Sequence, residues 1–154
     1  MLEKSLDLQQ IASAVQEVFL SPELAQLMKQ SVLLKQKCDN DFVSNVDEAL
    51  EDFFQKGLKE IYDVGFFGEE SQVIPEENSF WIVDPLDGTS NFLNGLAPVC
   101  TSIALAIKGK TALGVVHNYS DSSTYFAIRG GGVFKRSGGP AVYETIRLPL
   151  DRPP

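Results

Sequence analysis

Two aspartates, Asp84 and Asp87, lie three residues apart in the stretch Trp81–Phe92, which reads W-I-V-D-P-L-D-G-T-S-N-F. We expect the apolar run Phe80–Val83 to form a buried strand. Because Pro85 has no N–H to give to a strand ladder, we expect the strand to end at Asp84-Pro85. Both carboxylates would then point at one place beyond the end of the strand. Oxygen ligands of this kind favour Mg²⁺ or Mn²⁺ over zinc.

A short helix is expected directly after the second aspartate. Asp87 and Gly88 form the predicted turn, and Thr89-Ser90-Asn91 begins the helix. The first N–H groups, those of Gly88, Thr89 and Ser90, would face the same place as the carboxylates, at the positive end of the helix dipole. Carboxylates beside phosphate-accepting amides indicate a divalent metal together with a phosphate. The alternative is an Asp-Pro turn followed by an ordinary helix cap, with no ligand.

Two amphipathic helices are predicted at the N-terminal end of the chain. Apolar residues recur at helical spacing within residues 5–20. Ser21-Pro22-Glu23 then begins a second helix, with serine as the cap and proline at the first helical position. Its apolar stripe continues to about Leu34. Packing against a core is a sufficient explanation of both helices.

The segment between these helices and the motif contains another helix. Lys35–Asn40 is predicted to be a polar loop, and Phe42-Val43 a short extended piece. Apolar residues at helical spacing predict a helix over residues 46–60. Asp47 falls in its first turn, where the helix dipole favours a carboxylate. The dipole alone would explain Asp47, so this residue is open to a structural or a functional interpretation.

Short strands account for most of the remaining chain. The predicted strands are Asp63–Phe67, Cys100–Ile107, Thr111–His117, Thr124–Ile128 and Val133-Phe134. The last four are joined by short turns, which is typical of an antiparallel meander. The triplet Gly130–Gly132 lies between two of these strands and lacks the Lys-Ser/Thr of a phosphate-binding loop. Helices followed by a meander predict a layered α+β fold with a largely antiparallel sheet.

Composition narrows the class of protein further. The chain has 154 residues, 44% hydrophobic and 22% charged, which suits one globular domain over residues 1–150 with a frayed end at 151–154. A net charge of −8 argues against nucleic acid as a general partner. Cys38 and Cys100 form no C-x-x-C pair and are expected to be reduced thiols. With no signal peptide or membrane-spanning run in the sequence, we expect a cytoplasmic protein with no membrane partner.

Nucleophilic catalysis of the serine-hydrolase kind has no support in the sequence. A nucleophile elbow such as G-x-S-x-G is absent. The single histidine, His117, ends a predicted strand and is expected to be packed or half-exposed rather than catalytic. Trp81 is expected to lie in the core and to anchor the strand that presents Asp84.

Three segments, taken in order, resemble the inositol monophosphatase family of metal-dependent, lithium-sensitive phosphatases. Trp81–Phe92 resembles the first signature of the family, and Gly68-Glu69-Glu70-Ser71 resembles its G-E-E-S element. Lys37–Asp47 resembles its K-x-x-x-D-x-V-T-x-x-D element, although Ser44 stands where threonine is commoner. The resemblance covers roughly residues 35–95 and implies the layered α/β sandwich of the sugar phosphatase fold.

The resemblance also implies a set of metal ligands for two or three Mg²⁺ ions. Glu69, Asp84 and the carbonyl of Leu86 would hold one ion, and Asp84 and Asp87 a second, with Asp84 bridging. Such ions neutralise a phosphate, stabilise a leaving oxygen and lower the pKa of a bound water. The implied substrate is a small phosphomonoester.

The remaining implied roles concern water and phosphate. Thr89, together with Glu69, would orient the attacking water, and Asp47 would hydrogen-bond to Thr89 from behind. The N–H groups of Gly88 and Thr89 would bind phosphate oxygens. Lys37 would lie near the metal-bound water or a third metal.

One element of the family is not found in this chain. Members carry a second, W-D-x-A-G-like signature in their C-terminal half, and the single tryptophan here, Trp81, belongs to the first signature. We therefore expect the chain to correspond to the N-terminal half of such an enzyme, with the C-terminal family domain absent. A site lacking one anionic ligand would bind its second metal weakly, so we expect little phosphatase activity from the 154 residues alone.

Three functions remain open within these limits. The first is hydrolysis of inositol monophosphate or a related polyol or sugar phosphate, which Asn91-Phe92 favours. The second is a 3′(2′),5′-bisphosphate nucleotidase, although those enzymes usually carry an acidic residue where Asn91 stands; Thr89 argues against fructose bisphosphatases, which usually have D-G-S-S-N. The third is a non-catalytic regulatory or interaction protein that keeps the metal-site scaffold. The resemblance also implies a homodimer.

Overall fold

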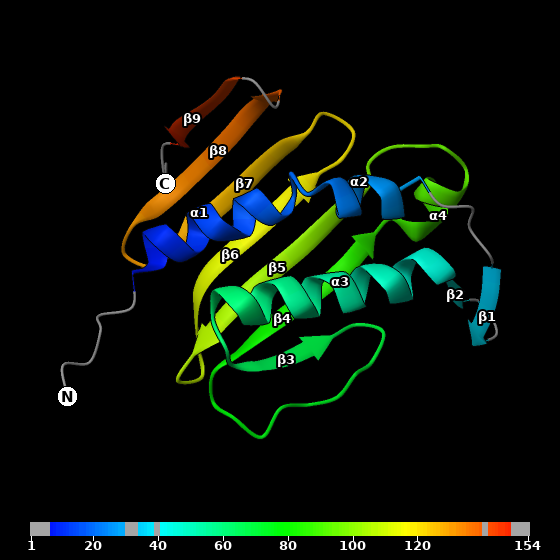
Figure 1. Cartoon of the computed structure of the whole chain (residues 1–154), viewed down its shortest axis with the longest axis horizontal. Coiled ribbons are helices and arrows are strands. Elements are labelled where there is room, and N and C mark those ends of the chain that lie inside the picture. Colours follow the sequence, from blue (N-terminus) through cyan, green and yellow to red (C-terminus); the bar gives the residue numbers. More distant parts are fainter. Residues whose placement is uncertain (1–6, 30–33, 39–40, 140–141, 149–154) are drawn as a thin grey trace, which may run out of the picture.

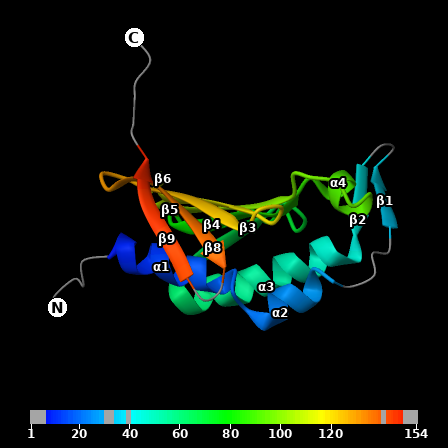
Figure 2. The ribbon, with the colours of Figure 1, turned by 90° about the horizontal axis from the view of Figure 1, so that it is seen from above.

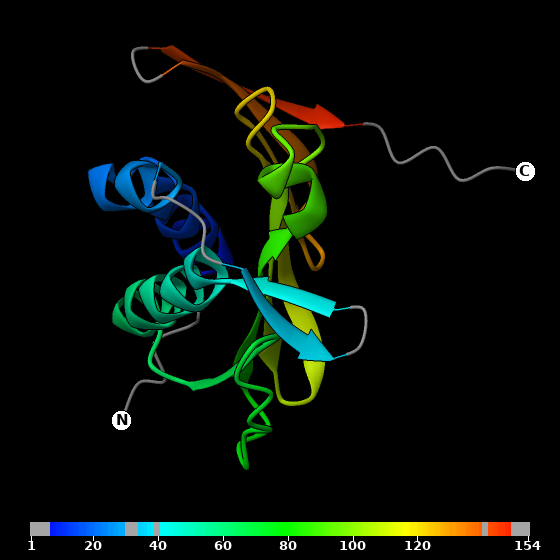
Figure 3. The ribbon, with the colours of Figure 1, turned by 90° about the vertical axis from the view of Figure 1, so that its right-hand side faces the viewer.

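In the computed structural model, helices cover one face of a twisted sheet and leave the other face bare (Figures 1 and 2). The described residues are 7–29, 34–38, 41–139 and 142–148, and the described side chains exclude those of 34–38, 41–45, 138–139 and 142–143. A short helix and a separate hairpin lie together at one end of the sheet (Figure 3). The architecture is the predicted layered α+β fold.

Helices and strands follow one another in a simple order. The helices are α1 (Leu8–Val18), α2 (Pro22–Leu27), α3 (Asn45–Ile61) and α4 (Thr89–Leu93). The strands are β1 (Leu34–Cys38), β2 (Asp41–Ser44), β3 (Gly65–Gly68), β4 (Phe80–Asp87), β5 (Cys100–Ile107), β6 (Lys110–Asn118), β7 (Ser123–Ile128), β8 (Gly132–Gly139) and β9 (Val142–Leu148). The main sheet runs β3 to β9 in sequence order, with β3 parallel to β4 and every other neighbouring pair antiparallel.

The start of α2 is confirmed, whereas its predicted length is wrong. The Ser21 hydroxyl accepts the N–H of Glu23 at 3.2 Å, and proline follows the cap. The helix ends at Leu27, and Leu34 is the first residue of β1. Three polar residues, Lys29-Gln30-Ser31, interrupt the apolar stripe directly after Met28.

The prediction of a polar loop over Lys35–Asn40 is also wrong. Strand β1 pairs with β2 in a separate antiparallel hairpin, from Leu34 opposite Ser44 to Cys38 opposite Asp41. Backbone hydrogen bonds hold such a pair whatever the polarity of its side chains, so the sequence shows no apolar alternation here. The hairpin places Lys37 in β1; its side chain lies outside the described part of the chain.

The core lies between the helices and the inner face of the sheet. Trp81 is completely buried, and its indole N–H donates to the carbonyl of Tyr62 at 3.0 Å, which confirms its predicted place in the core. Other members are Val15, Leu24, Leu50, Phe54 and Leu58 from the helices, and Val83, Ile103, Leu105, Leu113, Val115 and Phe126 from the sheet. Burying a side chain of this size contributes roughly 1.5–3 kcal/mol. The core therefore fixes strand β4 firmly against α3.

Strand β4 does not end at Asp84-Pro85 as predicted, but continues to Asp87. The paired residues around its irregularity are Asp84 with Ser102 and Asp87 with Cys100. Between these pairs β4 has two residues, Pro85 and Leu86, where β5 has one, Thr101. This is a β-bulge, a position at which the missing N–H of a proline breaks no ladder hydrogen bond.

The remaining predicted strands are confirmed, with different ends. Strand β8 extends well beyond Val133-Phe134, and β9 was not predicted. The helix predicted over residues 46–60 is α3, and that predicted over residues 5–20 is α1. No helix in the described residues is long and apolar enough to cross a membrane. The predicted domain limits, 1–150 and 151–154, stay a prediction.

His117 is packed inside the structure, as predicted. It is 8% exposed, and its Nδ1 atom lies 2.8 Å from the hydroxyl of Thr124. Its ring stacks on Phe19, with centroids 4.4 Å apart, and meets Tyr119 edge-on at 4.8 Å. Burial lowers the pKa of His117 to about 4, against a smaller opposing effect of the Asp121 charge.

Acid should therefore destabilise the fold through His117. Its ordinary pKa is 6.5, so between pH 6.5 and 4 the unfolded chain binds more protons than the folded one, and stability falls as the pH falls. We expect His117 to remove about 2.5 kcal/mol from the free energy of unfolding between pH 7.5 and 4.5. Urea denaturation of the parent and of His117→Gln over this range measures the effect. Equal pH dependence in the two proteins would contradict the assignment.

Candidate active site

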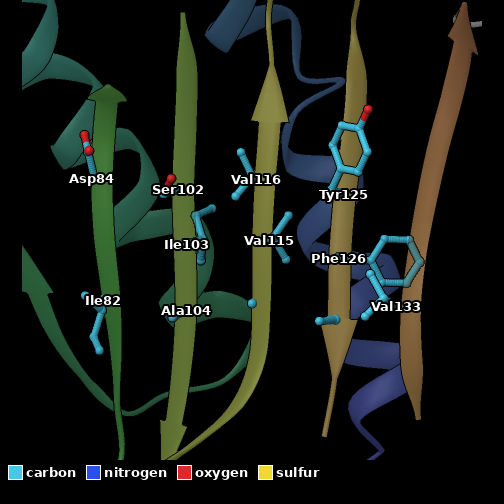
Figure 4. Close-up of a pocket in the computed structure, with 12 residues that line it drawn as sticks. Ile82, Asp84, Ser102, Ile103, Ala104, Val115, Val116, Tyr125, Phe126 and Val133 are labelled. Carbon is cyan, nitrogen blue, oxygen red and sulfur yellow. The ribbon is translucent and has the colours of Figure 1, made fainter. Parts of the chain in front are cut away.

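The bulge places Asp84 and Asp87 on the same face of the sheet. In a regular strand, residues three apart point to opposite faces. In β4, Pro85 and Leu86 are both buried toward the helices, whereas Asp84 is half-buried and Asp87 exposed. The extra residue thus returns Asp87 to the outer face. Figure 4 shows Asp84 on that face, near the end of β4 and on the same strand as Ile82.

Local hydrogen bonds fix the turn that follows the bulge. The N–H of Leu86 donates to the carboxylate of Asp84 at 3.2 Å, and the hydroxyl of Thr89 donates to the carbonyl of Leu86 at 2.9 Å. Gly88 has φ 89°, in the left-handed region, and a Cβ there would lie 2.7 Å from the carbonyl oxygen of Pro98. Glycine is therefore required at this position. As predicted, a helix begins at Thr89.

Glu69 reaches the site from the neighbouring strand. Strand β3 runs parallel to β4 and pairs Gly68 with Val83. The next N–H, that of Glu69, donates to the carbonyl of Val83 at 3.1 Å. This register places Glu69 beside Asp84, close enough for its negative charge to raise the pKa of that aspartate. Two residues fifteen apart in the sequence are thus brought together by one parallel strand pair.

Negative charge accumulates at this end of the sheet. Burial raises the pKa of Asp84 to about 7, helped by the charge and hydrogen bond of Glu69 and by the charge of Asp87; the N–H of Leu86 acts in the opposite direction. Burial first, and then the neighbouring aspartates, also raise the pKa of Cys100, a free thiol opposite Asp87. A proton or a metal cation would relieve this repulsion.

The donor atoms suit Mg²⁺. Among the described residues, no three Asp, Glu, His or Cys side chains already converge on one point. The site instead contains two carboxylate pairs that share Asp84, one with Glu69 and one with Asp87. Mg²⁺ prefers oxygen ligands and usually keeps several waters, so one or two carboxylates from the protein are enough. The residues present therefore fit this ion.

Two hollows meet at Asp84. One, of about 460 Å³, is lined by Glu69 and Asp84 together with Phe67, Gln72 and Ile74. The other, of about 400 Å³, extends from Asp84 across the bare outer face toward Tyr125 of β7 (Figure 4). Its walls are almost entirely apolar apart from the end that holds Asp84. There is room for a small molecule beside the carboxylates.

The sequence analysis missed Glu51 as a residue of the site. This glutamate of α3 is only 6% exposed, and its carboxylate accepts the N–H of Glu70 at 2.7 Å and that of Ser71 at 3.0 Å. A Cβ at Gly68 would overlap this carboxylate. Glu51 thus fixes the loop that carries Glu69. The available signal was an acidic residue inside the apolar stripe of the helix, one turn after Asp47.

The other predicted residues are placed as follows. Asp47 lies in the first turn of α3 and is 2% exposed. In the structure the Thr89 hydroxyl donates to Leu86, and a hydrogen bond between Asp47 and Thr89 stays a prediction. Gly88 caps α4, and the binding of phosphate oxygens by the N–H groups of Gly88 and Thr89 stays a prediction. The role of Lys37 stays a prediction.

Comparison with known proteins agrees with this geometry. The family model described as "Inositol monophosphatase family" matches residues 2–151. An inositol-1-monophosphatase of Mesorhizobium japonicum is 40% identical over 122 residues, which are 77% of this chain and 46% of the relative. A Nus factor SuhB of Pasteurella multocida is 38% identical over 99 residues, which are 62% of this chain and 37% of the relative.

Solved structures agree as well. An IMPase/NADP phosphatase in complex with Mg²⁺ and phosphate superposes with a TM-score of 0.69 at 31% identity, over 83% of this chain and 51% of that one. The chain thus spans about half the length of the relatives it matches. Since the family model matches nearly all of the sequence and the fold agrees, the chain belongs to the inositol monophosphatase family.

Proposed function

We propose that the chain carries the metal-binding half of a Mg²⁺-dependent phosphomonoesterase that hydrolyses inositol monophosphate or a related polyol or sugar phosphate. The observation that carries the proposal is the bulge in β4, which puts Asp84 and Asp87 on one face beside Glu69. The name of the Mesorhizobium relative and the Mg²⁺ and phosphate in the solved relative support it.

The proposed ligands follow the two carboxylate pairs. Glu69, Asp84 and the carbonyl of Leu86 would hold one Mg²⁺, and Asp84 with Asp87 a second; a third ion would lie toward Lys37. The side chain of Asp87 is exposed and free to turn toward Asp84. When bound, the ions would neutralise the phosphate and lower the pKa of a coordinated water.

The chain's own groups would position water and phosphate. Thr89 gives its hydroxyl proton to Leu86, so the lone pairs of its oxygen can accept a hydrogen bond from the attacking water. Glu69, whose side chain is exposed at the rim of the site, would orient that water together with Thr89. The N–H groups of Gly88 and Thr89 would hold phosphate oxygens. Asp47, whose carboxylate can only accept, would orient Thr89 from the buried side once the hydroxyl proton turns from Leu86 toward it.

The expected activity of the 154 residues and their cellular setting are also part of the proposal. Because the matched relatives are about twice as long, we expect the 154 residues to bind metal but to hydrolyse substrate slowly. The groove beside Asp84 is open to water, which weakens electrostatic stabilisation of a transition state. Lithium sensitivity, a homodimer and a cytoplasmic location remain parts of the proposal.

A regulatory role is the second candidate. Relatives that match as well as the phosphatases are named Nus factor SuhB, so family membership alone does not establish catalysis. A protein of this kind would keep the metal-site scaffold and act by binding a partner. Our prediction that the chain has no nucleic-acid partner would then restrict which kind of molecule that partner can be. Activity that survives loss of the metal ligands would favour this candidate.

Replacing either aspartate on the outer face should weaken metal binding. We expect Asp84→Asn and Asp87→Asn each to lower Mg²⁺ affinity at least about tenfold, the size of effect seen when support of a metal ligand is lost. Calorimetric titration with Mg²⁺ measures the affinity. Asp121→Asn is the matched control, because this aspartate also raises the pKa of Cys100 but is not a proposed ligand.

The same proteins should be assayed with inositol 1-phosphate, with Mg²⁺ and with or without Li⁺. Hydrolysis that needs Mg²⁺ and both aspartates supports the phosphatase. Metal binding without turnover supports the proposed ligands and shows that these 154 residues alone do not catalyse the reaction. Unchanged Mg²⁺ affinity in both aspartate variants would contradict the proposed function.

Loss of the Glu51 carboxylate should disturb the metal site from a distance. In Glu51→Gln only one side-chain oxygen can accept, so one of the two loop N–H groups loses its partner, at a cost of about 1–3 kcal/mol in the free energy of unfolding. We also expect a several-fold lower Mg²⁺ affinity, because the loop carries Glu69. Glu60→Gln, at an exposed position of the same helix, is the control. Equal stability of the two variants would refute this role.

A further inference from the structure

A buried pair of hydroxyl groups lies directly behind the bulge. Thr101, the residue of β5 opposite Pro85 and Leu86, is completely buried. Its hydroxyl donates to the carbonyl of Pro85 at 2.8 Å. The hydroxyl of Tyr119 lies 2.7 Å from the same Thr101 oxygen. Neither residue belongs to the metal and phosphate groups described above.

The direction of these hydrogen bonds follows from proton counting. A carbonyl oxygen can only accept, so the single hydroxyl proton of Thr101 points at Pro85. Tyr119 must therefore donate to Thr101. Burial raises the pKa of Tyr119, which keeps its phenol protonated and able to donate. Hydrogen bonds arranged in such a chain strengthen one another.

The chain of hydrogen bonds ends on the carbonyl oxygen of Pro85, which lies within the bulge. Pro85 and Leu86 share one partner residue, so the carbonyl of Pro85 lies outside the regular ladder and needs another donor. Thr101 supplies it from the residue directly across. Tyr119 is held in turn by an edge-on contact with His117, which stacks on Phe19 of the segment after α1. The support of the bulge thus extends through the core to the residue that caps the C-terminal end of α1.

We propose that Thr101 and Tyr119 are positioning residues: their hydroxyl chain holds the bulge in the form that keeps Asp84 and Asp87 on one face. The consequence for metal binding rests on the proposed function. The pair touches neither carboxylate, and acts through the backbone between them. Replacing Thr101 by valine keeps the shape of the side chain and leaves the Pro85 carbonyl without its donor.

Amide hydrogen exchange in the absence of metal tests the hold on the bulge. In Thr101→Val we expect exchange at Leu86 and Asp87 to become about tenfold faster, the effect of one buried acceptor left unsatisfied. The amides of Phe80–Val83 in the same strand should be unchanged. Thr101→Ser should restore slow exchange, and Tyr119→Phe should give a smaller increase, because it leaves the bond to Pro85 intact.

Ser123→Ala is the matched control, because it removes a hydroxyl that is likewise buried and hydrogen-bonded, in this case to Asp121 rather than to His117 or Tyr119. It should leave exchange at the bulge unchanged. If Thr101→Val does not fold, Tyr119→Phe decides the question through the same amides. Unchanged exchange at the bulge in the folded variants would overturn the inference.

Binding of Mn²⁺, followed by electron paramagnetic resonance, tests the link to the metal. We expect Thr101→Val to bind Mn²⁺ several-fold more weakly than the parent, and Ser123→Ala to bind it equally well. Faster exchange at the bulge with undiminished Mn²⁺ affinity would show that the pair is merely structural and would overturn the positioning role. If the parent binds no Mn²⁺, the proposed function fails, and amide exchange alone decides whether the pair holds the bulge.

Discussion

One extra residue in strand β4 determines the arrangement of the whole site. Without the bulge at Pro85 and Leu86, the alternation of a strand would send Asp84 and Asp87 to opposite faces of the sheet. With it, both carboxylates emerge on the outer face, and the chain then turns at Gly88 into α4. Trp81 and the helices behind the sheet hold the strand from which the bulge departs. The core thus holds strand β4 in place, and the bulge determines that both carboxylates point to the outer face.

The site is also a balance between repulsion and support. Burial and the charges of Glu69 and Asp87 raise the pKa of Asp84 to about 7. Two buried polar side chains hold the backbone that carries these carboxylates, in spite of the repulsion between their charges. Glu51 fixes the loop of Glu69, and Thr101 supports the bulge between Asp84 and Asp87. Strain of this kind is typical of a site that is completed by a cation.

The sequence was sufficient for what depends on composition and local pattern. The apolar periodicity of α3 and the apolar run before Asp84 predicted a helix and a buried strand, and the ordered motifs predicted the family. It was insufficient where pairing decides the structure. From the local sequence, Pro85 predicted the end of a strand. The strand instead continues through a bulge opposite Thr101, and this partner residue is distant in sequence. The same holds for the pairing of the polar strands β1 and β2, and for the hydrogen bonds from Glu51 to the loop of Glu69. Both depend on partners that no local pattern reveals.

The claim that the bulge builds one metal site on the outer face is tested most directly by crystallography with Mn²⁺. An anomalous difference map of crystals soaked in Mn²⁺ locates the ion without any assumption about activity. We expect a peak on the outer face at the end of β4, bounded by Asp84, Asp87 and Glu69. A peak elsewhere, or a β4 in which the two aspartates point to opposite faces, would contradict the account.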